Sequence, residues 1–135
     1  MSGTAIIRSL LAARPKVTDL VPVAKIYAGT ISQGSITTAI SVRPVSSNEF
    51  WTTARNLQTK MIRERIQVTA YAKDFPTLER ILKACSLGAG VHTGTVLGYK
   101  VRSIMPESVG PYIEATDDGI HEQSRDFMVT FMEAN

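Results

Sequence analysis

The sequence contains few of the residues on which metal sites and many catalytic sites depend. Its 135 residues include one cysteine, Cys85, and two histidines, His92 and His121. A single thiol excludes an internal disulfide framework and a cysteine-based zinc site. Neither histidine belongs to a cluster with the spacing of a metal site, so we expect both at the surface. Cys85 falls on an apolar helical stripe, which predicts a buried, unreactive thiol rather than a nucleophile.

Long apolar runs are absent as well. No stretch approaches the roughly 20 apolar residues that a membrane-spanning helix needs. Near the N-terminus, Arg8 interrupts the apolar positions Ile6, Ile7, Leu10 and Leu11, so this run is shorter than the apolar core of a signal peptide. We therefore expect a soluble protein that is made inside the cell and does not bind membranes.

The common motifs of nucleotide and acyl chemistry are also missing. The chain has no phosphate-binding loop with Gly-Lys-Ser/Thr and no Gly-x-Ser-x-Gly elbow. Gly88, Gly90 and Gly94 come close to a dinucleotide fingerprint, but a helical pattern precedes them, whereas that motif must follow a strand. The adjacent Asp117 and Asp118 are more typical of a turn than of an acid–base pair. We predict no enzymatic activity and no cofactor.

Two alternating segments are the clearest patterns that the sequence does contain. Between residues 63 and 73 the small and apolar side chains of Ile66, Val68, Ala70 and Ala72 fall on one face, and polar side chains fall on the other. Near the C-terminus, residues 126–131 alternate in the same way, with apolar side chains at 127, 129 and 131. A period of two predicts half-buried strands with one packed face. These patterns indicate a scaffold rather than a catalytic site.

The remaining elements follow from periodicity and from helix caps. We expect a helix over 4–14 and a second helix that Asp74 caps, that has Pro76 in its first turn and that ends at Gly88. Further strands are expected over 25–30, 36–42 and 96–104, followed by a long acidic loop over 106–119 with room for a short strand at 112–115. Ser46 and Glu49 have the spacing of a capping box, so residues 45–62 form either a short helix or a loop. The order predicts a single domain over 1–135 with an α+β fold, an antiparallel sheet of four to five strands with two main helices on one face.

The charges divide unevenly along the chain. Residues 1–102 hold 14 Lys/Arg and 5 Asp/Glu, a balance of +9, whereas residues 103–135 hold 1 Lys/Arg and 7 Asp/Glu, a balance of −6. Folding can mix these charges on one surface. Alternatively, the molecule has a basic side and an acidic side, and copies of it associate head to tail; a contact of that kind makes a ring when it closes.

One segment combines basic and aromatic side chains, from Phe50 and Trp51 through Arg55 and Lys60 to Arg65. Such a segment can hold phosphates and stack bases. Trp and Arg also dominate contacts between proteins. The acidic C-terminal third weighs against nucleic acid, so a loop that docks a protein partner or a plain surface loop is the preferred interpretation. A nucleic-acid-binding module is the alternative.

Taken in order, these segments resemble the phage tail completion protein family, which includes the tail terminators of long-tailed bacteriophages. The resemblance covers nearly the whole chain. It is carried by the opening helix, a basic-Ile-Tyr-x-Gly strand, the turn after it, a central strand leading into a helix, and an acidic turn before the last strand. These correspond to Ala5–Ala13, Lys25–Gly29, Gln33-Gly34, Arg65–Ala72 with Thr77–Leu87, and Thr116–His121 with Phe127 and Val129.

The resemblance implies an α+β subunit that assembles as a ring, commonly of six copies, at the head-proximal end of the tail tube in the virion. Its partners would be other copies of itself, the tail tube protein and the head connector or stopper protein. DNA would pass through the channel without specific binding, and assembly would take place in the host cytoplasm. Another head–tail connector or neck protein is the alternative.

Six residues are the candidates for partner or self contacts. They are Trp51, Arg55, Lys60, Glu114, Asp117 and Asp118. As a hypothesis, the acidic members of this set, together with Glu107, line the channel or meet the basic side of a neighbouring copy. An acidic lumen would let DNA slide without adhering.

Overall fold

The computed structural model describes residues 2–29, 38–50, 59–87, 94–114 and 119–134. Three helices, one 3-10 turn and seven strands make up the described part of the chain. The helices are α1 (Ser2–Ala12), α2 (Pro15–Thr18) and α3 (Phe75–Ala84), and the 3-10 turn is η1 (Val23–Lys25). The strands are β1 (Ile26–Ala28), β2 (Ala39–Phe50), β3 (Thr59–Ala72), β4 (Gly94–Val96), β5 (Tyr99–Val109), β6 (Ile113–Glu114) and β7 (His121–Ala134).

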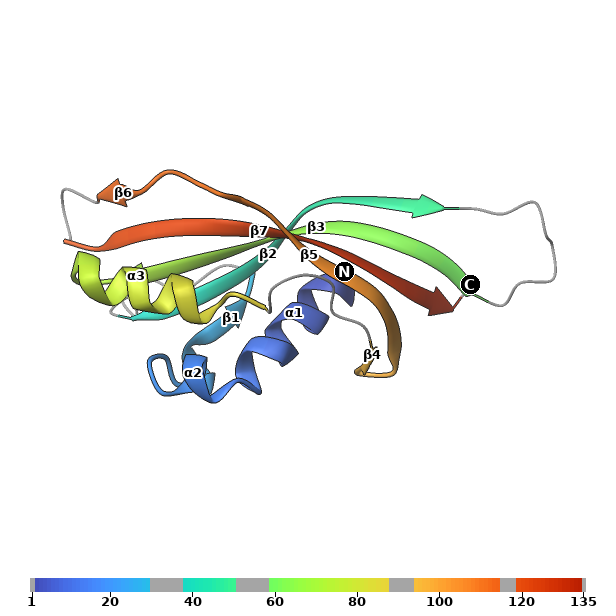
Figure 1. The fold of residues 1–135 in the computed structure, drawn as a ribbon, viewed down its shortest axis with the longest axis horizontal. Helices are drawn as coiled ribbons and strands as arrows, with labels where there is room; N and C mark the ends of the chain where they lie inside the picture. Colours follow the sequence, from blue (N-terminus) through green and yellow to red (C-terminus); the bar gives the residue numbers. More distant parts are fainter. Residues whose placement is uncertain (1, 30–37, 51–58, 88–93, 115–118, 135) are drawn as a thin grey trace.

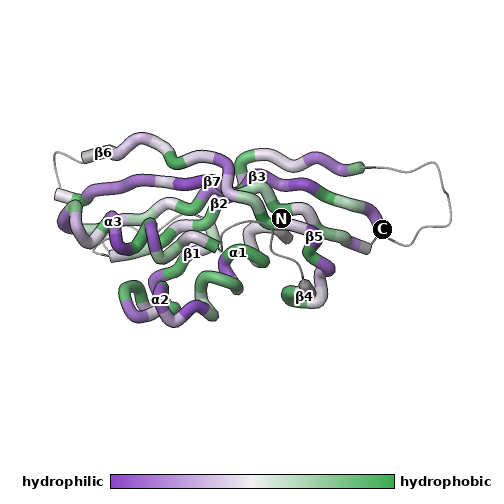
Figure 2. The backbone as a smooth tube through the Cα atoms, in the orientation of Figure 1, coloured by the Kyte–Doolittle hydropathy of each residue, from purple (hydrophilic) through white to green (hydrophobic). Residues whose placement is uncertain are grey.

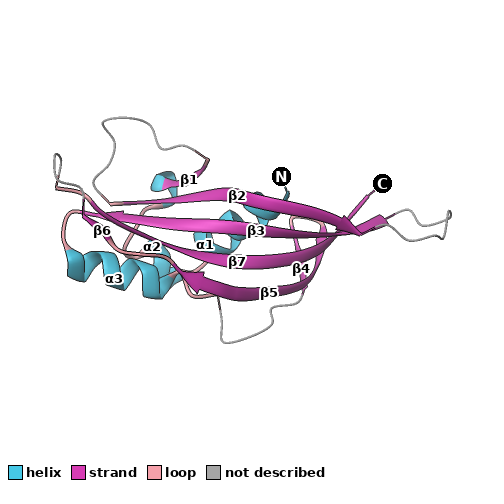
Figure 3. Ribbon diagram, turned by 90° about the horizontal axis from the view of Figure 1, so that it is seen from above, coloured by secondary structure: helices cyan, strands magenta, loops and turns pink. Residues whose placement is uncertain are grey.

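All seven strands belong to one sheet. Six of them lie in the order β1-β2-β3-β7-β5-β4, and β6 pairs with β7 beside that path. The long strands β2, β3, β7 and β5 lie side by side along the length of the molecule (Figure 3). These long neighbours are antiparallel, whereas β1 runs parallel to β2. The helices lie on one side of this twisted sheet (Figure 1), and no helix in the described ranges covers the other side.

The predicted fold class, an antiparallel sheet of four to five strands with two main helices on one face, is therefore wrong. The sheet has seven strands and is mixed, and most of the structure is this sheet rather than a pair of helices. The strands β1, β4 and β6 contain only two or three residues. β1 and β6 fall within the segments expected over 25–30 and 112–115, whereas β4 is too short to have a measurable periodicity. The direction in which a strand pairs is not encoded in alternation.

The segment after residue 44 also differs from its prediction. The strand β2 continues through Phe50, so the Ser46–Glu49 spacing caps no helix. Pro44 does not end the strand, because a bulge between Pro44 and Ser46 absorbs it and pairing with β3 resumes beyond. Cross-strand hydrogen bonds over this length outweigh a local capping preference. Similarly, the expected acidic loop over 106–119 begins as strand, since β5 runs to Val109.

The faces predicted for the two central strands are confirmed. In β3 the side chains of Ile66, Val68, Ala70 and Ala72 are buried, and in β7 the apolar stretch after residue 126 supplies buried aromatic rings. Figure 2 shows β7 changing from hydrophilic in its first half to hydrophobic in its second half. The core lies between the helices and this inner face of the sheet. Its largest buried side chains include Ile6, Ile7 and Leu11 from α1, Leu78 and Ile81 from α3, and Ile66, Ile104, Phe127 and Phe131 from the sheet.

Local contacts define the start of α3 and join α1 to the sheet. Asp74 caps α3, because its carboxylate accepts a hydrogen bond of 2.8 Å from the Thr77 N–H. At the start of α1 the Gly3 N–H donates to Glu64 Oε1 at 3.2 Å, and Glu64 is buried on the inner face of β3. A Cβ at position 3 would lie 3.3 Å from the Glu64 side chain, so glycine allows this close approach.

Among the described helices, none is long and apolar enough to cross a membrane. Gly88, Gly90 and the expected turn at Gln33-Gly34 lie outside the described residues.

Candidate assembly interface

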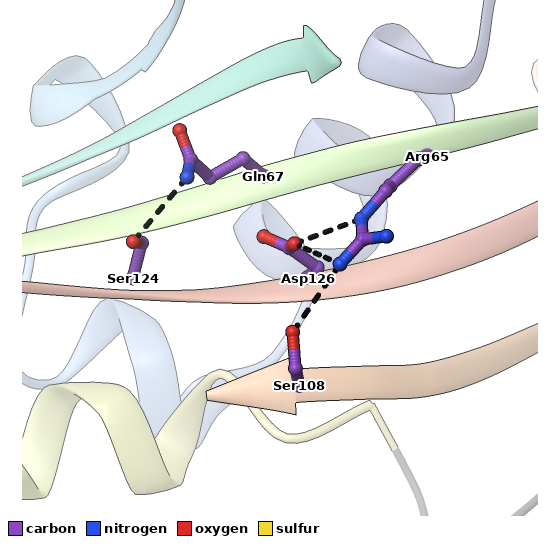
Figure 4. Close-up of polar contacts among 5 residues, drawn as sticks. All are labelled: Arg65, Gln67, Ser108, Ser124 and Asp126. Carbon is purple, nitrogen blue, oxygen red and sulfur yellow. Dashed lines mark hydrogen bonds and ion pairs between the residues drawn. The ribbon is translucent and has the colours of Figure 1, made fainter. Parts of the chain in front are cut away.

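The side of the sheet away from the helices is the open face, and polar contacts across strands order its centre (Figure 4). Arg65 on β3 donates from Nε and Nη2 to Asp126 Oδ2 on β7, at 2.9 and 2.8 Å. The same guanidinium reaches Ser108 Oγ on β5 at 3.3 Å, and Gln67 donates to Ser124 Oγ at 3.4 Å. Three strands are thus joined by side chains above their backbone ladders, so these polar groups are already paired with one another.

From this centre toward the C-terminal end of β7 the open face carries methionine. The chain has five methionines, and the four that follow Met1 all take outward positions in the strand register. Met61 lies opposite Met132 and Phe50, and Met105 lies opposite Met128. We call Phe50, Met61, Met105, Met128 and Met132 the methionine patch. Phe50 is 40% exposed and Met105 is 49% exposed, and the other three are half-buried.

Basic side chains surround this patch. Lys100 and Arg102 on β5 are exposed, and the Arg63 guanidinium lies 5.3 Å from the centre of the Phe50 ring, within the range of a cation–π contact. A hollow of about 440 Å³ opens beside Met132, lined by Thr59, Leu97, Gly98, Tyr99, Met132, Lys100 and Arg102. This end of the molecule therefore combines apolar sulfur and aromatic surface with positive charge.

The opposite end of the sheet presents exposed apolar side chains near one acidic residue. Val109 at the end of β5 is 55% exposed and Ile113 in β6 is 49% exposed. Glu107 is exposed just before them. Gly110 fixes the backbone between these residues, because its N–H donates to the Ser124 carbonyl at 2.7 Å. We call residues 107–113 the β5–β6 segment.

Aromatic contacts hold the β5–β6 segment against the body of the molecule. Tyr112 packs edge-on against Phe75, with ring centres 5.0 Å apart. It also stacks on His121 at 5.6 Å, and its hydroxyl forms a hydrogen bond with His121 Nδ1. The segment is thus positioned before any partner arrives, which lowers the entropic cost of binding through it.

The structure places two of the six predicted interface residues and does not bring them together. Lys60 lies near the start of β3 and forms an ion pair of 3.0 Å with Glu49. The backbone of Glu114 lies in β6, which pairs with the opposite end of β7. The other four, Trp51, Arg55, Asp117 and Asp118, lie outside the described residues.

Within the described part of the chain, no group of three or more His, Cys, Asp or Glu side chains could hold a metal ion. Cys85 is buried as the helical stripe predicts, and burial raises the pKa of its thiol to about 12. The pKa of Tyr71 is raised as well, first by burial and then by the nearby Glu122 carboxylate. These shifts come from packing, and neither residue is poised as a nucleophile at neutral pH.

The methionine patch is the feature that the sequence interpretation missed. A signal was present, because Met128 and Met132 occupy outward positions in a strand whose inward positions are Phe127, Val129 and Phe131. The grouping of Met61 and Met105 with them depends on strand register, which alternation in a single strand does not give.

Two solved structures share this fold. One chain belongs to the structure described as the virion of native gene transfer agent (GTA) particle. It matches with a TM-score of 0.70 and 10% identity, over 96% of this chain and 94% of that chain. A second solved chain, which carries no descriptive name, matches with a TM-score of 0.53 and 13% identity, over 96% of this chain and 95% of that one. No protein-family model and no curated protein matches the sequence. At these identities the likeness establishes a shared fold.

Proposed function

We propose that this chain is a structural protein of a phage-like virion. The observation that most directly supports this proposal is the fold. It matches a chain from a gene transfer agent particle over nearly the full length of both chains, with a TM-score of 0.70. Contacts within the described residues are also those of a scaffold. Ion pairs and side-chain hydrogen bonds join neighbouring strands, and the exposed apolar surface is suited to contacts between proteins.

Within the virion, we propose that the chain caps the tail tube at its head-proximal end as a ring and helps to join head and tail. The support for this position is the ordered resemblance of the sequence to tail completion proteins. Other copies, the tail tube protein and the head connector would be its partners, and six is the ring size that the resemblance implies. We further propose that residues 1–135 form one domain. In the ring, Asp117 and Asp118 would lie either in the channel or against a neighbouring copy.

Electron microscopy of particles made without this gene tests the position. If the chain ends tube polymerisation, the lysate will contain filled heads without tails beside tails that exceed the normal length. Supplying the wild-type gene in trans should restore whole particles of normal tail length, which controls for effects on neighbouring genes.

Free heads beside tails of normal length would contradict the capping role and support a neck or connector protein instead. Whole, infectious particles would contradict a structural role in head–tail joining altogether. Tail length therefore separates the two candidate positions, which the shared fold alone does not.

A further inference from the structure

The sheet has two free edges, one on each side, and each belongs to a long strand. β1 pairs with β2 only at residues 40–42, and no described strand pairs with the outer edge of β2 over residues 43–50. On the other side β4 pairs with β5 only at residues 99–101, so the outer edge of residues 102–109 likewise has no partner among the described strands. Residues 43–50 and 105–109 are all exposed. In Figure 3 β2 and β5 are the outermost of the long strands. The backbone N–H and C=O groups along such edges are available to another strand.

We propose that the free edge of β2 in one copy pairs with the free edge of β5 in the next copy, so that the sheet continues from subunit to subunit. This proposal rests on the self-assembly put forward above and names the surfaces that carry it. The occupant of each edge is a second copy of this chain. Because the two edges differ, the contact is heterologous, and a closed ring of copies fills every edge.

Strand direction is the first argument. From β2 through β3 and β7 to β5, each strand is antiparallel to the next, so β2 and β5 of one copy run in opposite directions. Rotation of a subunit about an axis along the strands keeps every strand direction unchanged. The β5 edge of the next copy therefore approaches β2 as an antiparallel neighbour, which is the pairing that already joins the long strands. Antiparallel pairs are also slightly more stable per residue than parallel ones.

The second argument is that the two free edges lie at the same level along the strands. Cross-strand partners in β3 and β7 connect residues of β2 with residues of β5. The pairs at equal level are Asn48 with Ser103, Ser46 with Met105, and Pro44 with Pro106. Copies placed side by side, without a shift along the strands, would therefore bring residues 43–48 of one copy against residues 103–108 of the next.

The third argument is charge. Within β2 the basic Arg43 precedes the acidic Glu49, and within β5 the basic Arg102 precedes the acidic Glu107. In the antiparallel alignment at equal level, Arg43 falls beside Glu107 of the next copy. Glu49, which also pairs with Lys60 in its own copy, falls beside Arg102. Opposite charges on neighbouring strands stabilise the pairing, whereas a parallel alignment would bring like charges together.

Proline limits how these edges pair, and its effect falls on a single level. Pro44 and Pro106 each lack a backbone N–H, and a register shift follows each of them. Such interruptions make an edge a poor template for an unrelated strand. Because the two prolines are level with one another, a ladder between copies lacks their donors at that level only. Residues 46–48 and 103–105 keep their N–H groups for pairing.

Charge reversal tests the proposal by sedimentation velocity. Arg43→Glu and Glu107→Arg each place like charges beside one another at the contact, so each variant alone should self-associate about tenfold or more weakly than the wild type. An equimolar mixture of the two should regain the wild-type affinity, because every contact between unlike variants again joins opposite charges. The double variant, with both changes in one chain, should also associate like the wild type.

Lys16→Glu and Glu79→Arg are the matched controls, since they reverse exposed charges on the helical side and should leave association unchanged. Circular dichroism checks that each variant folds, and Arg43→Gln or Glu107→Gln, which should weaken association less, replaces a reversal that does not. A mixture that stays as weak as the single variants overturns the proposal. So does a Glu107→Arg variant that associates as strongly as the wild type, since it would place β5 outside the contact.

Hydrogen–deuterium exchange distinguishes a backbone ladder from contacts between side chains alone. Amides over residues 43–48 and 103–108 should exchange more slowly in concentrated, assembled protein than in dilute protein, because paired N–H groups are protected. Amides in the middle of α3 should exchange equally in both and serve as the control. Protection at neither edge, or at the β2 edge alone, overturns the proposal.

This inference and the capping role can fail separately. A wild-type chain that stays monomeric at every concentration overturns the inference, whereas the capping role would stand if copies assembled only on the tube. A species that stops at two copies also overturns the inference, because two copies joined head to tail keep two edges open and would grow further. Edge pairing in solution, together with whole and infectious particles made without the gene, would instead support the inference and contradict the structural role.

Discussion

At the scale of single residues, Glu64 is the charged side chain with the most consequence for stability. It is 2% exposed on the face of β3 that is otherwise apolar. One carboxylate oxygen accepts the Gly3 N–H of the first helical turn, where the helix dipole favours negative charge. Its other oxygen has no hydrogen-bond partner among the described residues. Burial of this group therefore costs free energy, and the contact with α1 offsets that cost.

We expect Glu64→Ala to lower the free energy of unfolding by about 1–3 kcal/mol, because a buried N–H loses its acceptor. Urea denaturation followed by circular dichroism measures this change. Glu79→Ala on the exposed side of α3 is the control and should change stability by no more than about 0.5 kcal/mol. An unchanged or higher stability for Glu64→Ala would mean that burying the carboxylate costs at least as much free energy as its hydrogen bond with Gly3 contributes.

Cys85 should resist thiol reagents in the folded protein. Burial raises the pKa of this thiol to about 12, so almost no thiolate exists at pH 8, and the thiolate is the reactive form. A maleimide should label the chain only after unfolding in guanidinium chloride, as mass spectrometry would show. Stoichiometric labelling of the folded protein at pH 8 would contradict the buried position.

The same thiol predicts a pH dependence of stability. Its pKa of about 12 in the folded state exceeds the ordinary value of 9.0, so the folded state holds this proton more tightly. The stabilising difference is fully present below about pH 9 and is lost as the pH rises from there through 12. Between pH 9 and pH 12 the Cys85→Ala variant should therefore lose less free energy of unfolding than the wild type. Parallel losses in the two proteins would exclude Cys85 as the cause.

At the scale of elements, the two faces of β3 should respond differently to the same truncation. Ile66→Ala removes a fully buried side chain and should cost about 2–5 kcal/mol, from lost burial and the cavity left behind. Gln67→Ala, one residue on, removes an open-face side chain and should change stability by about 0.5 kcal/mol or less. Urea midpoints compare the pair directly. Equal losses would mean that both faces are packed.

Elements with strong local signals were predictable from the sequence. Asp74 was recognisable as the cap of α3 because a carboxylate before Pro76 and an apolar stripe identifies a helix start without tertiary information. The alternation around Ile66 and Phe127 likewise reports burial on one face directly. In each case the residues that determine the local structure lie within about a dozen consecutive positions.

Elements defined by their partners were not predictable. The second half of β2 looks like a helix start at Ser46, yet it becomes strand because β3 supplies hydrogen bonds along its length. The parallel pairing of β1 and the alignment of Met105 with Met128 also depend on segments far apart in the chain. Short-range patterns contain no information about such register, so the strand count and the methionine patch emerge only in three dimensions.

At the scale of the whole molecule, charge does not divide along the sheet as it divides along the sequence. The basic residues Arg63, Lys100 and Arg102 border the methionine patch, but Glu133 lies opposite Lys60 at that end, and Arg43 lies beside Ile113 at the other. Among the described residues, folding therefore mixes the two charge blocks. The centre of the open face is closed by Arg65 and its partners.

The most direct test of the central claim is where this chain lies in the particle. Purified particles from cells that carry the gene can be labelled with a gold-conjugated antibody against the recombinant protein and viewed by electron microscopy. Particles from cells that lack the gene control for stray labelling. Our account predicts label at a single site, where the tail meets the head. Label along the tail, at its far tip or over the head surface would contradict the capping position, and particles without label would contradict a virion protein.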